Sequence, residues 1–284
     1  MSHVRVIALF TLRESLRRRV FLVVALLTLA FLGLYALGTW QLFDELDKNE
    51  LSNSGVELGI VAGATLLGLA MFGTLFLGTV LAVFLTLGAV RGDAERGLLQ
   101  PLLVRPVPRR TLLLGRYVAA ATVCALYVIG VFLAAAVITW ITGDWWPDRL
   151  IVPALGLAFA VAILAAVSLA GSVYLSATAN GIAVFMVFGA GLIAGLLGQI
   201  GEGLDVDGLR TASSIISWIV PFEALYQNGL DALTSDIGGA TGVIVQLGPF
   251  GGASGVGAAI WPWAVAWSAA VLALAALAFN RRDL

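Results

Sequence analysis

Charged residues are scarce in this chain, and so are cysteine and histidine. Only 12% of the 284 residues are charged, whereas 60% are hydrophobic. This composition excludes a soluble enzyme and predicts a protein that lies in a lipid bilayer. The single cysteine, Cys124, excludes an internal disulfide, and the single histidine, His3, excludes a multi-histidine metal site within one chain. The absence of a Gly-x-x-x-x-Gly-Lys-Ser/Thr motif excludes the usual P-loop nucleotide site.

Long uncharged stretches occupy most of the sequence, and about 20 apolar residues suffice to cross the hydrocarbon core of a bilayer. The stretch 150–201 would make a helix of about 78 Å, so it must hold two spans. The segment 176–181, which contains Asn180 and Gly181, is expected to supply the turn between them. We therefore predict an all-α polytopic membrane protein with one transmembrane domain over 1–284 and six spans, at about 20–40, 58–90, 117–142, 150–175, 181–200 and 260–279.

Basic residues are distributed unequally between the two sides that six alternating spans define. With a cytoplasmic N-terminus, thirteen of the sixteen basic residues lie in the cytoplasm, and only Lys48, Arg149 and Arg210 lie outside. The positive-inside rule requires this bias. A seventh span would place Arg281 and Arg282 on the wrong side. The chain is therefore expected in the plasma membrane with both termini in the cytoplasm.

Residues 1–19 precede the first span and carry several arginines. We expect them to form an amphipathic helix at the membrane surface, with an apolar face of Val6, Leu9, Leu12 and Leu16. A merely basic flank of the first span is the alternative. A cleaved signal peptide does not fit, because the basic segment is long and no clear small-x-small cleavage site follows the apolar run.

The interior of the six predicted spans contains no Asp, Glu, Lys, Arg or His. Ion-coupled carriers and pumps usually keep such residues at mid-membrane, so we expect the energy for transport to come from elsewhere. Small residues are abundant instead, and Gly191 with Gly195 forms a small-xxx-small pair. A similar ladder on the fourth span predicts a helix-packing or dimer face, packing within one chain being favoured: Ala158, Ala162, Ala166 and Ala170.

The segment 201–259 is too long for a simple connector and too interrupted for a span. Its apolar stretch 209–220 reaches only about 18 Å as a helix, and Pro221 can open a second short helix. We expect two short re-entrant helices in the outer leaflet, before the last span. Trp218, Pro221 and Glu223 are candidate residues of an outer gate, although a helix-dipole role without substrate contact is favoured for Glu223.

The cytoplasmic loop 91–116 is the most distinctive stretch of the sequence. Acidic residues at its start and a following leucine pair predict a short surface helix that Pro101 limits. Pro106, Arg109 and Arg110 then form a stiff basic turn. An ordinary basic connector is the alternative interpretation. The candidate coupling residues of this loop are Asp93, Glu95, Arg96, Leu98, Leu99 and Pro101.

The same loop resembles that of the permease subunits of ATP-binding-cassette transporters, in the type-2 exporter class. The resemblance rests on Glu95, Gly97, the pair 102–103, Pro106 with Arg109, and the pair 115–116. It also extends to the layout of the whole chain. It implies that two permeases, identical or related, pair in the membrane and bind two cytoplasmic ATPase subunits, with the helix near 93–100 as the coupling helix. ATP and Mg²⁺ would bind to the ATPase partner, so no cofactor and no nucleic acid are expected on this chain.

Three functions follow from these observations. The leading hypothesis is a permease that exports a hydrophobic or amphipathic compound with ATP hydrolysed by a separate subunit. A non-transporting membrane component, such as a sensor or an assembly or maturation complex driven by a partner ATPase, is the second. An intramembrane enzyme is the third, and it lacks the expected constellation of His, Asp and Glu in the spans.

Overall fold

A computed structural model describes residues 19–48, 58–87, 109–235, 237, 241 and 257–280. The described residues form eight α-helices and no strand. Six are long and apolar enough to cross a membrane, which confirms the expected number of candidate spans. They are α2 (Arg19–Lys48), α3 (Leu58–Thr86), α6 (Arg109–Gly143), α7 (Ile151–Tyr174), α8 (Ala177–Gly203) and α12 (Ile260–Asn280), and the two short helices are α9 (Asp207–Ile219) and α10 (Pro221–Thr234).

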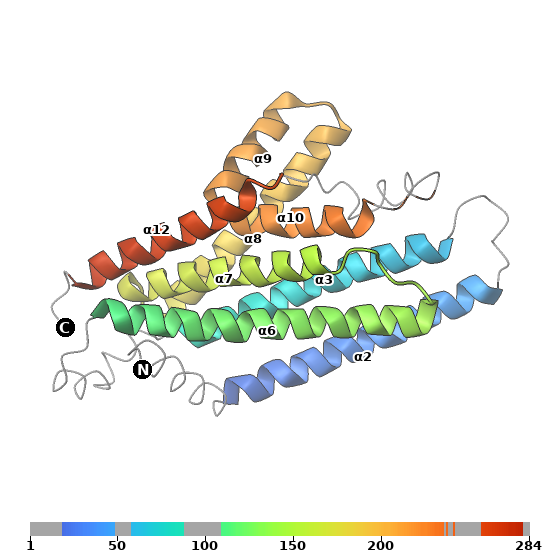
Figure 1. Cartoon of the computed structure of the whole chain (residues 1–284), viewed down its shortest axis with the longest axis horizontal. Coiled ribbons are helices and arrows are strands. Elements are labelled where there is room, and N and C mark those ends of the chain that lie inside the picture. The colour runs from blue at the N-terminus through green and yellow to red at the C-terminus, as the bar shows by residue number, and fades with distance from the viewer. Residues whose placement is uncertain are drawn as a thin grey trace.

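Most of the long helices lie side by side in one bundle (Figure 1). Helix α7 is the central element, because it contacts α3, α6, α8, α10 and α12. The end of α3 and the start of α6 share one end of the bundle, which we call the α3–α6 end, and the link between α6 and α7 lies at the opposite end, the α6–α7 end. The start of α2 and the end of α12 point toward the α3–α6 end, as an even number of spans requires.

Helix α2 lies at the edge of the bundle, where its outward leucines stay exposed. Leu22, Leu29 and Leu34 are each more than 60% exposed. On the opposite face Tyr35 and Thr139 share a hydrogen bond of 2.6 Å between their hydroxyl groups, which ties α2 to α6. A helix that is apolar on its exposed side is typical of a span that contacts lipid.

Several helices extend beyond the apolar stretches from which the spans were predicted, α2 and α6 by the most. Helix α2 continues to Lys48, and α6 begins at Arg109, before the predicted start at 117. At 1.5 Å per residue, the 30 residues of α2 reach about 45 Å, whereas the hydrocarbon core is about 30 Å thick. Hydropathy detects only the part of a helix that lies in hydrocarbon, so it misses the polar turns that continue into water.

The turn expected at 176–181 is wrong in its position. Helix α7 ends at Tyr174 and α8 begins at Ala177, so Asn180 and Gly181 lie inside α8. Asn180 is 1% exposed, and its Nδ2 donates to the backbone carbonyl of Ser168 on α7 at 2.8 Å. The physical reason is that a buried amide can satisfy its donor on a neighbouring span, so the residue stabilises the contact between α7 and α8 instead of a turn.

The alanine ladder lies on a helix that is buried on most of its surface. Ala158 and Ala166 are buried, and Ala162 and Ala170 are partly buried. Fifteen residues of α7 are buried, and they surround the ladder on both sides. A packing face remains the better prediction for these alanines, because neighbouring helices of the same chain already cover most of α7.

The expected amphipathic helix at 1–19 falls outside the described residues, apart from Arg19 at the start of α2. The same is true of most of the glycine-rich stretch before the last span and of residues 88–108 in the loop that was predicted to be cytoplasmic.

Candidate functional site at the junction of α8, α9 and α10

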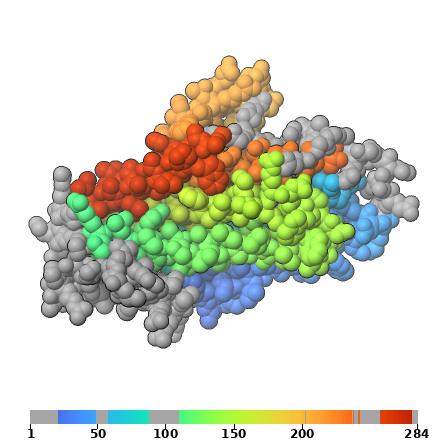
Figure 2. All heavy atoms as spheres, in the orientation of Figure 1, coloured from blue at the N-terminus to red at the C-terminus, as the bar shows by residue number. Residues whose placement is uncertain are grey.

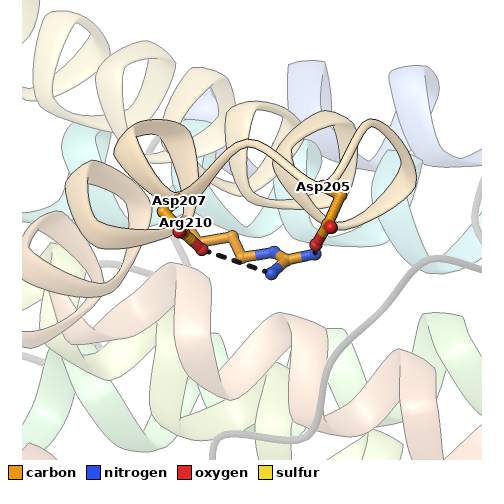
Figure 3. Close-up of polar contacts among 3 residues, drawn as sticks. All are labelled: Asp205, Asp207 and Arg210. Atoms are coloured by element: carbon orange, nitrogen blue, oxygen red, sulfur yellow. Dashed lines mark hydrogen bonds and ion pairs between the residues drawn. The ribbon is translucent and has the colours of Figure 1, made fainter.

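The segment after α8 forms the two expected short helices, and an ion-pair cluster marks the reversal between α8 and α9. Asp205 has a φ of +56°, in the left-handed region that reverses the chain direction. Arg210 Nη2 lies 2.6 Å from an Asp205 carboxylate oxygen, and its Nη1 lies 3.5 Å from Asp207 (Figure 3). Both carboxylates are exposed, so each pair contributes at most about 1 kcal/mol, and the cluster mainly fixes the shape of the turn.

Helix α9 then returns along α8 in the antiparallel direction, and glycines on α8 allow this close approach. A Cβ atom added to Gly198 would lie 2.5 Å from Ser213 Oγ, and one added to Gly201 would lie 2.9 Å from Leu209 Cβ. At distances below 3.0 Å a neighbouring atom would have to shift to admit a Cβ atom. The hairpin of α8 and α9 projects from the side of the bundle (Figures 1 and 2). We call this hairpin the α8–α9 arm.

Helix α10 begins at Pro221, which occupies the first turn, where a missing N–H has no cost. Ten of its fourteen residues are buried. Against α7 the two backbones nearly touch, since a Cβ on Gly156 would lie 2.8 Å from the Leu225 carbonyl oxygen. A Cβ on Gly229 would lie 3.0 Å from Pro153 Cα. Helix α10 is therefore part of the core, near the α6–α7 end of the bundle, although it is too short to cross a membrane.

The small-xxx-small pair on α8 receives the first turn of α10. Phe222 occupies the space beside Gly191, where an added Cβ would lie 2.6 Å from its Cζ atom. The Phe222 ring also stacks on Phe188 of α8, with ring centroids 5.7 Å apart. The Glu223 carboxyl group lies directly against Gly195. The pair predicted as a helix-packing face thus packs against α10.

Glu223 is a buried carboxyl group with few polar partners. It is 2% exposed, and its Oε2 lies 3.4 Å from Ser217 Oγ on α9, whose single hydroxyl proton is shared with the Ser213 carbonyl at 2.9 Å. Its Oε1 receives no hydrogen bond of ordinary geometry from the described residues. Burial raises the pKa of Glu223 to about 7, and the neighbouring Gln227 and Ser217 side chains oppose this rise because they stabilise the ionised form.

Polar side chains from three helices meet around this carboxyl group. Gln199 of α8 donates through Nε2 to Oε1 of Gln227 on α10, at 3.3 Å. Tyr226, one turn after Glu223, is 4% exposed, and its hydroxyl has no hydrogen-bond partner among the described residues. Burial and the nearby Glu223 raise the pKa of Tyr226 far above its usual range. We call Gln199, Ser217, Glu223, Tyr226 and Gln227 the Glu223 cluster.

The three candidate gate residues do not converge on one point. Trp218 lies at the end of α9 and is 39% exposed. Its ring meets that of Trp263 on α12 edge to face, with centroids 5.8 Å apart, and Trp263 Nε1 donates to the Trp218 carbonyl at 2.9 Å. Trp218 therefore links α9 to α12, whereas Glu223 faces α8 and α9.

Sequence reasoning proposed Glu223 but missed Gln199, Ser217, Tyr226 and Gln227. Two signals could have found part of the cluster. Glu223 and Gln227 have the spacing of neighbours on one helix face. Gln199 is the one amide side chain in the predicted span 181–200. Ser217 had no such signal, because its contact with Glu223 depends on the reversal at Pro221.

The candidate coupling residues fall in 88–108, outside the described residues, as does Pro106. Arg109 and Arg110 do not form a turn, because they are the first two residues of α6, and the Arg110 side chain is exposed. Among the described residues, no group of three or more His, Cys, Asp or Glu could hold a metal ion.

A comparison with curated proteins finds no relative that matches the chain. A family model described as "ABC-2 family transporter protein" matches residues 5–284, which include all eight helices, the loop 91–116 and the Glu223 cluster. This match confirms the family that the motifs of the loop indicated. The six apolar helices agree with a membrane component. The chain belongs to the ABC-2 family of transporter membrane proteins.

Proposed function

We propose that this chain is the permease subunit of a transporter that exports a hydrophobic or amphipathic compound. Members of the ABC-2 permease family lack ATPase domains, and the family implies a partner ATPase subunit. The absence of ionisable residues from the interior of the spans supports an energy source outside the membrane. The apolar surface that the bundle exposes is compatible with a substrate that partitions into lipid.

The observation that carries this proposal is the placement of α9 and α10. Helix α10 lies against α7 near the α6–α7 end, α9 lies on α8, and Trp218 connects α9 to α12. Helix α10 thus lies near the α6–α7 end, and α9 lies beside the bundle in the α8–α9 arm (Figure 1). With both termini and the loop 88–108 in the cytoplasm, as the positive-inside rule favours, this end faces outward. The two helices would dip into the outer leaflet and narrow the exit of the translocation path.

The remaining parts of the proposal concern partners. The loop residues Asp93, Glu95, Leu98 and Leu99 would contact the ATPase, and a second permease copy or a homologue would complete the path across the membrane. The opposite end of the molecule would then convert nucleotide-driven motion into movement of α9 and α10.

A reversible cross-link tests the gate. In a Cys124→Ala background, Trp218→Cys and Trp263→Cys would be joined by a short bifunctional thiol reagent with a cleavable disulfide spacer. We expect the cross-link to stop efflux of amphipathic dyes such as rhodamine 6G from cells that also express the ATPase, and reductant to restore it. Trp140→Cys with Trp146→Cys is the matched control, because that ring pair has centroids 6.1 Å apart and does not involve α9 or α10.

Two results would count against the proposal. Dye efflux that continues with the cross-link in place would exclude the gate. ATPase-dependent activity of the complex without transport of any dye in the panel would favour the non-transporting alternative.

A further inference from the structure

Helix α10 has an extensive contact with α7 of the bundle and only a small contact with the α8–α9 arm. Helix α10 makes its broadest contact with α7, and its contacts with α8 and α9 are much smaller, whereas α8 and α9 contact each other broadly. The α7–α10 pair therefore behaves as one body and the α8–α9 arm as another. The contacts between the arm and α10 are few: the first turn of α10 supplies Phe222 and Glu223, and Gln227 accepts a hydrogen bond from Gln199 of α8. The arm is also held to α7 at the start of α8 and to α12 through Trp218.

In the first turn of α10, the two side chains that contact the arm, Phe222 and Glu223, differ in chemistry. Phe222 is fully buried and stacks on Phe188, which is an ordinary apolar contact. Glu223 inserts a carboxyl group between Gly195 of α8 and Ser217 of α9. Neither Gly195 nor Ser217 carries a positive charge, and Oε1 of Glu223 is buried without a hydrogen bond of ordinary geometry. An ionised carboxylate is costly in such a place, whereas a protonated one is a neutral group.

The helices packed around Glu223 offer no charge that would compensate it. Helices α3 and α12 carry no ionisable residue, α7 carries only Tyr174, at its far end, and the one ionisable residue of α8 is the acidic Glu202, two turns after Gly195 in the sequence. On α10 the other groups are Tyr226, which stays neutral, and Asp231, two turns away, whose pKa is raised by burial while Arg149 lowers it. On α9, Arg210 lies two turns from Ser217 and pairs with Asp205 and Asp207.

From this arrangement we propose that Glu223 is a proton-operated latch between the α8–α9 arm and the α7–α10 body. The protonated carboxyl group holds the arm against α10. Loss of the proton drives the group toward water, and the arm separates from α10. The proposal rests on the proposed role of α9 and α10 at the outer exit, and it adds that the pH outside the membrane sets how readily this exit opens.

Distance measurements on the full chain in lipid nanodiscs test the latch. In a Cys124→Ala background, spin labels at Ser214→Cys on α9 and Asp148→Cys before α7 report the position of the arm, since both native side chains are exposed. Between about pH 5.5 and 8.5 we expect a second, longer distance population to grow as Glu223 ionises. Labels at Gln41→Cys and Asp148→Cys do not involve the arm and should show one distance throughout.

Three variants separate the latch from a general effect of pH. Glu223→Gln mimics the protonated group, so it should keep the short distance at every pH. Asp231→Asn removes another carboxyl group of α10 and should leave the wild-type response unchanged. Ser217→Ala removes a donor that stabilises the ionised form, so the transition should move to higher pH.

The outcomes are distinct from those of the gate test, because no transport is measured. A distance that does not depend on pH in the wild type, or the same dependence in Glu223→Gln, would overturn the latch. An unchanged midpoint in Ser217→Ala would also overturn it, and this variant keeps the test open if Glu223→Gln fails to fold. If the distances respond to pH as expected but dye efflux continues with the Trp218–Trp263 cross-link in place, the gate is disproved and the latch stands.

Discussion

The carboxyl group of Glu223 on α10 occupies the space that a Cβ atom on Gly195 of α8 would fill. This contact explains why both residue types are needed at the junction. A carboxyl group can enter only where the facing helix has no side chain, and a glycine in a membrane helix provides that space. The pair therefore defines the geometry on which the first prediction depends.

Gly195→Ala should destabilise the protein, because its Cβ would overlap the Glu223 carboxyl group. Overpacking of this kind typically costs about 1 to 3 kcal/mol. The measurement is the thermal unfolding midpoint of the purified chain, followed by size-exclusion chromatography after heating. Gly189→Ala on the same helix is the matched control, since nothing lies within 4 Å of its Cβ position. Equal midpoints for the two variants would contradict the close contact.

The second prediction concerns the dependence of stability on pH. The pKa of Glu223 is raised from its model-compound value of 4.5 to about 7, so the folded state binds its proton more tightly than the unfolded state. The stability that this proton contributes is fully present below about pH 4.5 and is lost as the pH rises through 7. The loss amounts to about 3 kcal/mol.

Glu223→Gln should remove this dependence, and chemical denaturation in detergent at several pH values measures it. Asp231→Asn serves as the control carboxyl variant and should retain most of the wild-type slope. Parallel pH profiles for the wild type and Glu223→Gln would show that the proton is bound elsewhere.

Asn180→Ala should weaken the contact between α7 and α8. The substitution removes the donor to the Ser168 carbonyl, and hydrogen bonds between membrane helices contribute about 0.6 kcal/mol on average and up to about 1.7. The unfolding midpoint of the purified chain reports the change. Thr178→Ala, an exposed position in the same turn of α8, should have no comparable effect. If Thr178→Ala costs as much as Asn180→Ala, the side-chain bond does not hold these helices together.

The fourth prediction concerns the loop 91–116 and its proposed contact with the ATPase. Replacing Leu98 and Leu99 by Asp should leave membrane insertion intact and release or uncouple the ATPase. The expected loss is about 1.5 to 3 kcal/mol per buried apolar side chain, together with the cost of placing charges in the contact. Co-purification of the ATPase with the tagged permease measures it. Replacing the same pair by Ile provides an apolar control, and normal ATPase recovery in the Asp variant would show that these leucines do not contact the partner.

The spans could be predicted because hydrocarbon imposes one requirement on every residue of a crossing helix. The junction of α8, α9 and α10 could be predicted only in part. Pro221 marks the start of α10, and the charge of Glu223 marks a residue that needs an explanation. Its burial follows from Gly191 and Gly195, which lie about 30 positions earlier in the chain. No local pattern connects these residues.

The turn between α7 and α8 was predicted from a local pattern, but at the wrong residues. Asn and Gly are typical of turns in water, because their side chains and backbone tolerate unusual angles there. Inside a membrane bundle, Asn180 donates a hydrogen bond to a carbonyl group on α7. Gly181 lies beside Leu87, and a Cβ atom added to Gly181 would lie 3.1 Å from Leu87 Cδ1. The same residue types therefore had a packing role that turn statistics do not describe.

The burial of α10 limits which segments of this chain can be exchanged with those of related proteins. Membrane proteins are commonly recombined by keeping the spans and exchanging the segments between them. Here the segment between α8 and α12 contributes ten buried residues from α10, which contact α7 through backbone atoms at Gly156 and Gly229. An exchange of that segment would replace part of the hydrophobic core. A functional chimaera must therefore carry α7, α8 and α10 from the same parent.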